Sequence, residues 1–304
     1  MQRVPSAPPS YSQELQSTSL QDEQTPPSYG DVAPTGPTTS PYRPFPDVMN
    51  GCYYMTGIKS LFLCGASRKE RLFLVEIHTG LSGKGPLGVR RGLYLHNGTS
   101  NKDAIIAAAG DNSVFAGRAY TFNTATVVYL PLLEPRASTH SMDTETMRAG
   151  LAGDEVVFRF SIEVGEKQQR ERFEWRKIQK GGGDAIKSGG FRLAQVSNRH
   201  KGTSTSRDVA SSSAREGPLC PQTETATDNA EVLALLSWPT GLSKLTNGFS
   251  LQLQGRAKSM GNRWSLMVVI TALRLWELHV QSRTSKTGIA IEGKLRGPSG
   301  DAEI

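Results

Sequence analysis

The chain has 304 residues, of which 37% are hydrophobic, and its formal net charge is +7. That apolar share is low for a compact protein of this length, which predicts that part of the chain does not fold. The basic residues alternate with apolar ones and form no continuous run, so the mild positive charge predicts no nucleic-acid partner.

Residues 1–50 form a head that we expect to be disordered. They hold ten prolines and few large apolar residues, so burial cannot offset the entropy of ordering. The head carries two basic and five acidic residues, which leaves a charge of about +10 on the rest of the chain. Its polar, proline-rich start is unlike a secretory signal.

Within the head, the sequence Pro-Pro-Ser-Tyr occurs twice, at residues 8–11 and 26–29. Paired prolines preset a polyproline II backbone that docks in an aromatic groove at little entropic cost, and tyrosine adds an apolar ring with a polar tip. Both copies match the Pro-Pro-x-Tyr ligand of WW domains. The alternative is a chance match in a proline-rich linker. The predicted binding residues are Pro8, Pro9, Tyr11, Pro26, Pro27 and Tyr29.

From residue 52 onward, short segments of alternating β-branched or aromatic residues are separated by turn signals. Their spacing is typical of an all-β domain. We expect strands at 52–64 (two strands), 71–78, 89–96, 104–109, 113–117, 125–132, 143–149, 155–164, 170–178, 190–196, 231–238 and 248–254. Basic residues on these strands suit a solvent-facing surface or, alternatively, an anionic partner.

The glycine-rich sequence GLSGKG at residues 80–85 suggests a phosphate-binding loop. Such a loop needs a glycine five residues before its Gly-Lys pair and Ser or Thr after it, whereas this chain has His78 and Gly85 there. We therefore expect a hairpin turn.

Residues 201–229 have no periodic pattern of apolar residues and hardly any large apolar residue, which predicts a disordered insertion. Residues 282–304 are expected to be a disordered tail.

The most apolar stretch is NRWSLMVVITALRLWELHV, at residues 262–280. From Trp264 onward it spans about 26 Å as a helix, less than the roughly 30 Å of a bilayer core, and Arg274 and Glu277 would be costly in lipid. We therefore expect no transmembrane segment. A helix apolar on all sides is a core helix, and its wall must be sheet, because nearly every other element is a strand. The predicted core residues are Trp264, Met267, Val268, Val269, Ile270, Leu273 and Trp276.

Three stretches carry a resemblance to a known family: RLFLVEIHTGLSGKGPLGVRRGLYLHNGTSNKDAIIAAAG, VVFRFSIEVGEKQQRERFEWRK, and EVLALLSW leading to NRWSLMVVITALRLWE. Together they resemble the fungal members of the tubby C-terminal-like superfamily, which includes LURP-one-related proteins and phospholipid scramblases. The resemblance implies a closed antiparallel barrel of about twelve strands around one hydrophobic C-terminal helix. Tubby proteins bind phosphoinositides, but their binding positions find no match here, and no catalytic residue carries over.

The sequence thus predicts one barrel domain at residues 51–281 between a disordered head and tail. Three cysteines, odd in number and without metal-ligand spacing, favour a reducing, cytoplasmic setting. We expect no metal, no cofactor and no catalytic residue. The expected function is a non-enzymatic intracellular adaptor whose head recruits WW-domain proteins such as HECT-type ubiquitin ligases. The alternatives are a peripheral membrane protein, whose basic barrel face binds anionic phospholipid or phosphoinositide, and an enzyme with a site at the barrel mouth.

Overall fold

A computed structural model describes residues 42–53, 60–112, 125–133, 142–178, 189–196, 230–239 and 247–290. Both PPSY motifs, the strand expected at 113–117 and the insertion expected at 201–229 lie outside the described residues. The described elements are β1 (Val48–Cys52), β2 (Ser60–Cys64), β3 (Arg71–His78), β4 (Gly92–His96), β5 (Ile105–Asp111), β6 (Ala125–Pro131), β7 (Met142–Ala152), β8 (Glu155–Val164), β9 (Gln169–Ile178), β10 (Gly190–Gln195), β11 (Val232–Ser237), β12 (Asn247–Leu253), the 3-10 helix η2 (Gly255–Met260) and α1 (Asn262–Val280).

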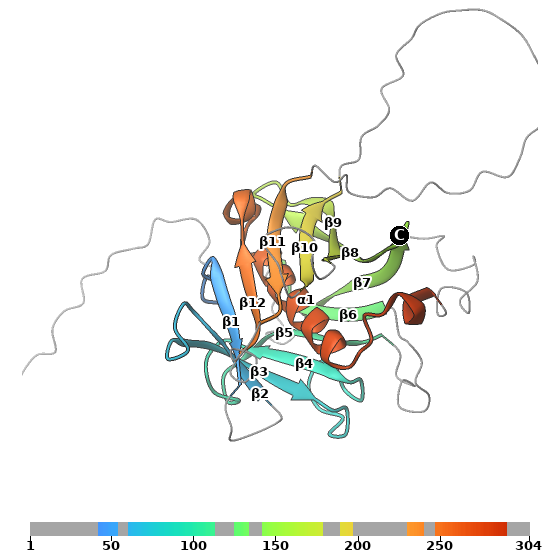
Figure 1. Cartoon of the computed structure of the whole chain (residues 1–304). Helices are drawn as coiled ribbons and strands as arrows, with labels where there is room; N and C mark the ends of the chain where they lie inside the picture. Colours follow the sequence, from blue (N-terminus) through green and yellow to red (C-terminus); the bar gives the residue numbers. More distant parts are fainter. Residues whose placement is uncertain are drawn as a thin grey trace, which may run out of the picture. The chain divides into compact units, whose positions relative to one another are not determined.

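The twelve strands form one closed antiparallel barrel around α1 (Figure 1). Each strand pairs with the next in the chain, and β1 closes the ring against β12, with Met49 opposite Leu251 and Gly51 opposite Phe249. Closure leaves the described sheet without a free edge that could add a foreign strand. This architecture confirms the predicted fold class.

Alternation along the strands decides which side chains face the helix. In β8, Phe158 and Phe160 belong to the central core, so Arg159 between them points to the outer surface. Strands β4 and β5 are buried on both faces, because the β3–β4 connection folds back over their outer side and covers Tyr94 and Ala108 with Leu87.

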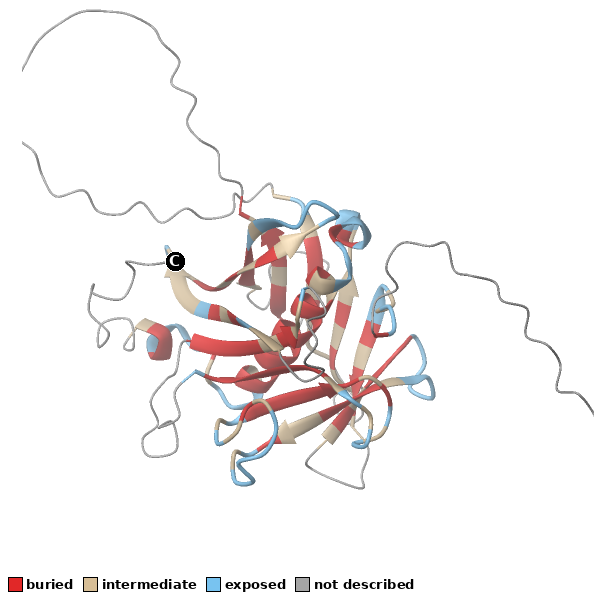
Figure 2. Ribbon diagram, turned by 180° about the vertical axis from the view of Figure 1, so that it is seen from behind, coloured by how far each residue is buried: buried red, intermediate tan, exposed pale blue. Residues whose placement is uncertain are grey.

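Helix α1 fills the interior of the barrel. Fourteen of its 19 residues are buried, and the burial runs around all of its sides (Figure 2). The predicted core residues (Trp264, Met267, Val268, Val269, Ile270, Leu273 and Trp276) are each at most 3% exposed. No helix in the described part of the chain has the length and apolar character needed to cross a membrane.

The folded domain extends beyond the boundaries expected from the sequence at both ends. Strand β1 begins at Val48, not at Gly51, and Tyr42 is buried, with Phe45 joining it to Phe73 through ring contacts of 6.1 and 4.9 Å. A few apolar residues among prolines carry no periodic signal, so only the pairing with β12 reveals this strand.

At the other end, residues 282–290 pack on the barrel, although the sequence assigned them to the tail. Thr284 and Ile289 are 3% and 5% exposed, and Lys177 Nζ donates a hydrogen bond of 2.6 Å to the Thr284 carbonyl oxygen. The predicted head and tail therefore included residues that belong to the folded domain at both boundaries.

The buried helix leads to a stability prediction. Val269 is fully buried, so Val269→Asp places an unpaired charge in the core and is expected to cost several kcal/mol, about the whole stability of a typical domain. Val280→Asp is the matched control, because Val280 lies on the same helix and is 61% exposed. Thermal unfolding should show a large loss for the first variant and a small one for the second. Equal melting of Val269→Asp and the parent chain would contradict the fold.

Candidate functional site

Arg274, in the C-terminal half of α1, lies inside the barrel with its side chain 1% exposed. Its guanidinium donates to Asp111 of β5, to Glu277 Oε2 at 2.7 Å and to Thr126 Oγ1 at 3.5 Å. Arg283 Nη2 also lies 3.0 Å from Asp111 Oδ1. Two arginines and two carboxylates thus form one buried cluster, which we call the interior cluster.

The interior cluster keeps Arg274 in its charged form. Burial alone would lower the pKa of Arg274, but the neighbouring Glu277 and Asp111 carboxylates outweigh that effect and raise it. Arg274 therefore stays protonated at every physiological pH. A permanently charged guanidinium surrounded by its counterions ties α1 to the β5 wall, and it offers no proton for catalysis.

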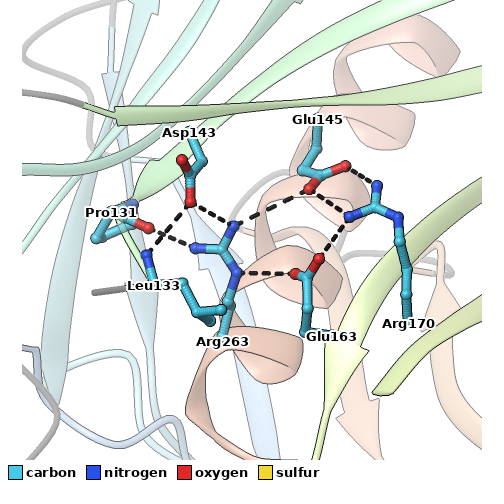
Figure 3. Close-up of polar contacts among 7 residues, drawn as sticks. All are labelled: Pro131, Leu133, Asp143, Glu145, Glu163, Arg170 and Arg263. Carbon is cyan, nitrogen blue, oxygen red and sulfur yellow. Dashed lines mark hydrogen bonds and ion pairs between the residues drawn. The ribbon is translucent and has the colours of Figure 1, made fainter. Parts of the chain in front are cut away.

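A second cluster, the mouth cluster, surrounds Arg263 at the N-terminal end of α1 (Figure 3). Arg263 contacts Asp143 Oδ2 at 3.0 Å and Glu163 Oε2 at 3.2 Å, and it donates to the Pro131 carbonyl oxygen. Arg170 lies on the other side of the same carboxylates and donates to Glu163 Oε1 at 2.5 Å and to Glu145 Oε1 at 3.0 Å. Glu145 and Glu163 thus contact both arginines, whereas Asp143 contacts only Arg263 of the two.

The electrostatics of the mouth cluster do not suit Glu163 to the role of a general acid. Burial alone would raise the pKa of Glu163, but its backbone hydrogen bond and those from Arg170 and Arg263 hold that pKa below its usual range. The hydrogen bond with Glu145 raises the pKa of Arg170 against the opposing effect of burial. Glu163 is therefore a carboxylate at neutral pH, whereas a general acid must carry a proton there.

The described residues offer no group of three His, Cys, Asp or Glu side chains arranged to hold a metal ion. Two of the histidines are engaged in the sheet. His78 Nε2 donates to the Gly88 carbonyl oxygen at 2.7 Å, and the His96 nitrogens lie 2.9 Å from the Asp103 carbonyl oxygen and 3.2 Å from Glu76 Oε2. These contacts position loops, and they engage both ring nitrogens of His96.

On the outer face of β8 and β9, the basic residues are partly neutralised. Glu174 points outward yet is fully buried, because Arg159 Nε and Arg176 Nε cover it at 2.7 and 2.6 Å. Arg176 also approaches Glu155 at 3.5 Å. This part of the surface therefore fits the solvent-facing interpretation of the alternating arginines better than an anion-binding one.

The strongest unbalanced charge lies around the β3–β4 connection. Residues 79–102 contain four basic residues and not one Asp or Glu. No described residue forms an ion pair with Lys84, Arg90 or Arg91, and the Arg90 Nε atom is buried without a hydrogen-bond partner in the described part of the chain. This connection, which we call the β3–β4 loop (residues 79–91), is the described surface best suited to an anion.

The residues expected from the sequence to be functional separate into two groups. The six residues of the PPSY motifs lie outside the described residues, and the seven helix residues come together inside the barrel as core. Sequence reasoning noted Arg274 and Glu277 only as charges that would be costly in a bilayer, and it missed both charged clusters. Their partners Asp111 and Asp143 are 163 and 120 residues away from the arginines in the chain, and no local pattern connects them.

No protein-family model matches the chain, and no curated protein or solved structure matches it. The proposed place in the tubby C-terminal-like superfamily thus stays a prediction, and function has to be argued from the residues themselves.

The interior cluster leads to a prediction about stability. Arg274→Leu leaves Glu277 and Asp111 buried without their main counterion, which should cost about 3–5 kcal/mol at neutral pH. Chemical denaturation of both chains at neutral pH measures this loss.

The matched control for this measurement is Arg256→Leu. Arg256 pairs with Glu231 at 3.0 Å, but both side chains are about half exposed, at 52% and 47%. An exposed pair contributes at most about 1 kcal/mol, so this variant should unfold nearly like the parent. An Arg274→Leu deficit no larger than that of the control would contradict the role given to the interior cluster.

Proposed function

We propose that this protein is a non-enzymatic adaptor that recruits WW-domain proteins through its N-terminal head. The observation that carries the proposal is the pair of identical PPSY sequences at residues 8–11 and 26–29. HECT-type ubiquitin ligases are the proposed partners, because they carry several WW domains. We also propose that the barrel belongs to the tubby C-terminal-like superfamily, which its twelve strands around one hydrophobic helix support.

The barrel does not need the head for its closure. The ring of strands closes with residues 48–253 alone, so no strand from residues 1–39 is needed to complete it. The interior is occupied by α1, and both ends of the helix lie in ion-pair clusters rather than in proton-donating sites. These features favour recognition by segments outside the barrel core.

The spacing of the two motifs suits a bivalent partner. Corresponding positions of the two motifs are 18 residues apart, and a flexible linker of that length spans about 25 Å, from roughly 5–6 Å times the square root of the residue number. Two WW domains of one ligase can then bind together, with an effective concentration near the millimolar range for the second contact. Each motif alone should bind weakly.

The test uses Tyr11→Ala, Tyr29→Ala and the double variant with a tandem-WW protein, measured by calorimetry. Each single change should weaken binding about tenfold or more, because the bivalent contact is lost, and the double change should abolish it. Pro34→Ala with Pro37→Ala is the matched control, because these prolines lie in the head but outside both motifs. Melting temperatures should not change. Unaltered binding of the double variant would remove the adaptor proposal.

A second candidate function is peripheral membrane binding, favoured by the acid-free basic segment at residues 79–102. Exposed cations that lack counterions attract anionic lipid headgroups, by about 1 kcal/mol for each Lys or Arg near the surface. The full chain should therefore sediment with liposomes containing phosphatidylserine and not with neutral ones. Salt should weaken the binding, since the screening length falls from about 10 Å at 0.1 M to about 3 Å at 1 M. Absence of binding to anionic liposomes at low salt would exclude this candidate.

A further inference from the structure

The β3–β4 loop holds the most exposed large apolar side chain of the described residues. Leu81 is 91% exposed, and Val89, in the same loop, is 54% exposed. The backbone on both sides of Leu81 lies near Val89: a Cβ added at Gly83 would lie 3.9 Å from Val89 Cγ1, and one added at Gly80 would lie 2.4 Å from the Val89 carbonyl oxygen. We call these two exposed apolar residues of one loop the apolar patch.

This patch is displayed by an anchored loop. Leu87 is fully buried and packs on Tyr94, Ala108 and Val127, on the outer side of β4 to β6. The Tyr94 hydroxyl donates to the Lys84 carbonyl oxygen at 2.9 Å, and burial raises the pKa of Tyr94 to about 12, so the phenol keeps its proton. The loop thus buries one leucine completely and leaves another almost completely exposed.

Glycines give the loop this path. Gly80 has a φ of +81°, and an added Cβ would lie 2.4 Å from the Val89 carbonyl oxygen. Gly85 has a φ of +74°, and an added Cβ would lie 2.8 Å from the Tyr94 hydroxyl. Other residues would be strained at both positions. The backbone is therefore built to turn tightly on both sides of Leu81 and to press against the barrel beyond it.

Charge surrounds the apolar patch on the same loop. Lys84 and Arg91 are exposed, Arg90 is half-buried with an unpartnered Nε, and residues 79–91 contain no acid. Two apolar side chains are far too little for a stable protein interface, which buries on the order of 1,000 Å² or more. A bilayer surface, in contrast, binds small apolar groups flanked by cations, since the apolar groups enter the headgroup boundary and the cations contact phosphates.

We propose that the β3–β4 loop is a membrane anchor, in which Leu81 and Val89 insert into the headgroup region of an anionic bilayer while the exposed Lys84 and Arg91 contact lipid phosphates. The inference rests on the membrane-binding candidate above and adds the place and the mode of contact. It differs from attraction by a basic surface alone, because part of the binding comes from apolar insertion and is therefore retained at high salt.

The experiment compares variants of the full chain by sedimentation with liposomes of phosphatidylcholine and phosphatidylserine, in 0.1 M and 1 M salt. Leu81→Ser should lower the partition coefficient about tenfold at both salt concentrations. Lys84→Gln with Arg91→Gln should lower it about fivefold for each charge, and only at low salt. Neither change should alter the melting temperature, since all three side chains are exposed.

Two matched controls keep the result specific. Val280→Ser removes another exposed apolar residue, and Lys69→Gln with Lys167→Gln removes the same charge from exposed positions elsewhere. Both should bind like the parent. In addition, the fluorescence of Leu81→Trp should shift to the blue with anionic liposomes and be quenched by brominated acyl chains, which reports entry of that position into the bilayer.

Three results would overturn the inference. If the parent binds anionic liposomes and the loop variants bind equally well, the contact lies on another surface, and the membrane-binding candidate survives without this anchor. If the parent binds no liposome at all, the candidate and the anchor fail together. If the parent self-associates in light scattering, Leu81→Ser abolishes that association, and Leu81→Trp gives no lipid quenching, the patch is a protein contact.

Discussion

A closed ring of twelve strands encloses more space than the side chains of its own strands can fill, and α1 fills that space. This requirement explains why the helix is apolar on all of its sides, in contrast to an ordinary surface helix. The dependence is mutual. Without the sheet around it, the helix would expose Trp264, Met267 and Leu273 to water, and without the helix the barrel would surround a large apolar void.

Apolar packing alone determines the direction and register of α1 only weakly. The charged clusters add contacts that fix both. Arg263 meets acids of β7 and β8 at the N-terminal end, while Arg274 meets Asp111 of β5 in the C-terminal half. Reversing or sliding the helix would leave buried charges unpaired, which is far more costly than the net gain from pairing them. We infer that these ion pairs specify the position of the helix more than they stabilise it.

The same architecture directs recognition to the outside of the barrel. Its ring has no free strand edge among the described elements, its interior is filled, and Glu163 in the mouth cluster is held as a carboxylate. What remains are the head with its two PPSY motifs and the β3–β4 loop with Leu81. We propose different partners for these two regions, a WW domain for the head and an anionic bilayer for the loop.

The sequence by itself determined the features that depend on local patterns. Alternation located most of the strands, and the stretch that is apolar on all sides identified α1 as core. The PPSY motifs can also be read from a local pattern, and their role stays a prediction. Only the tertiary structure showed that β1 starts at Val48 and that Arg274 forms an ion pair with Asp111. It also showed that one loop buries Leu87 and exposes Leu81. These outcomes depend on how the ring closes and which distant residues it brings together. Local periodicity reports which residues are buried, but not what they are buried against.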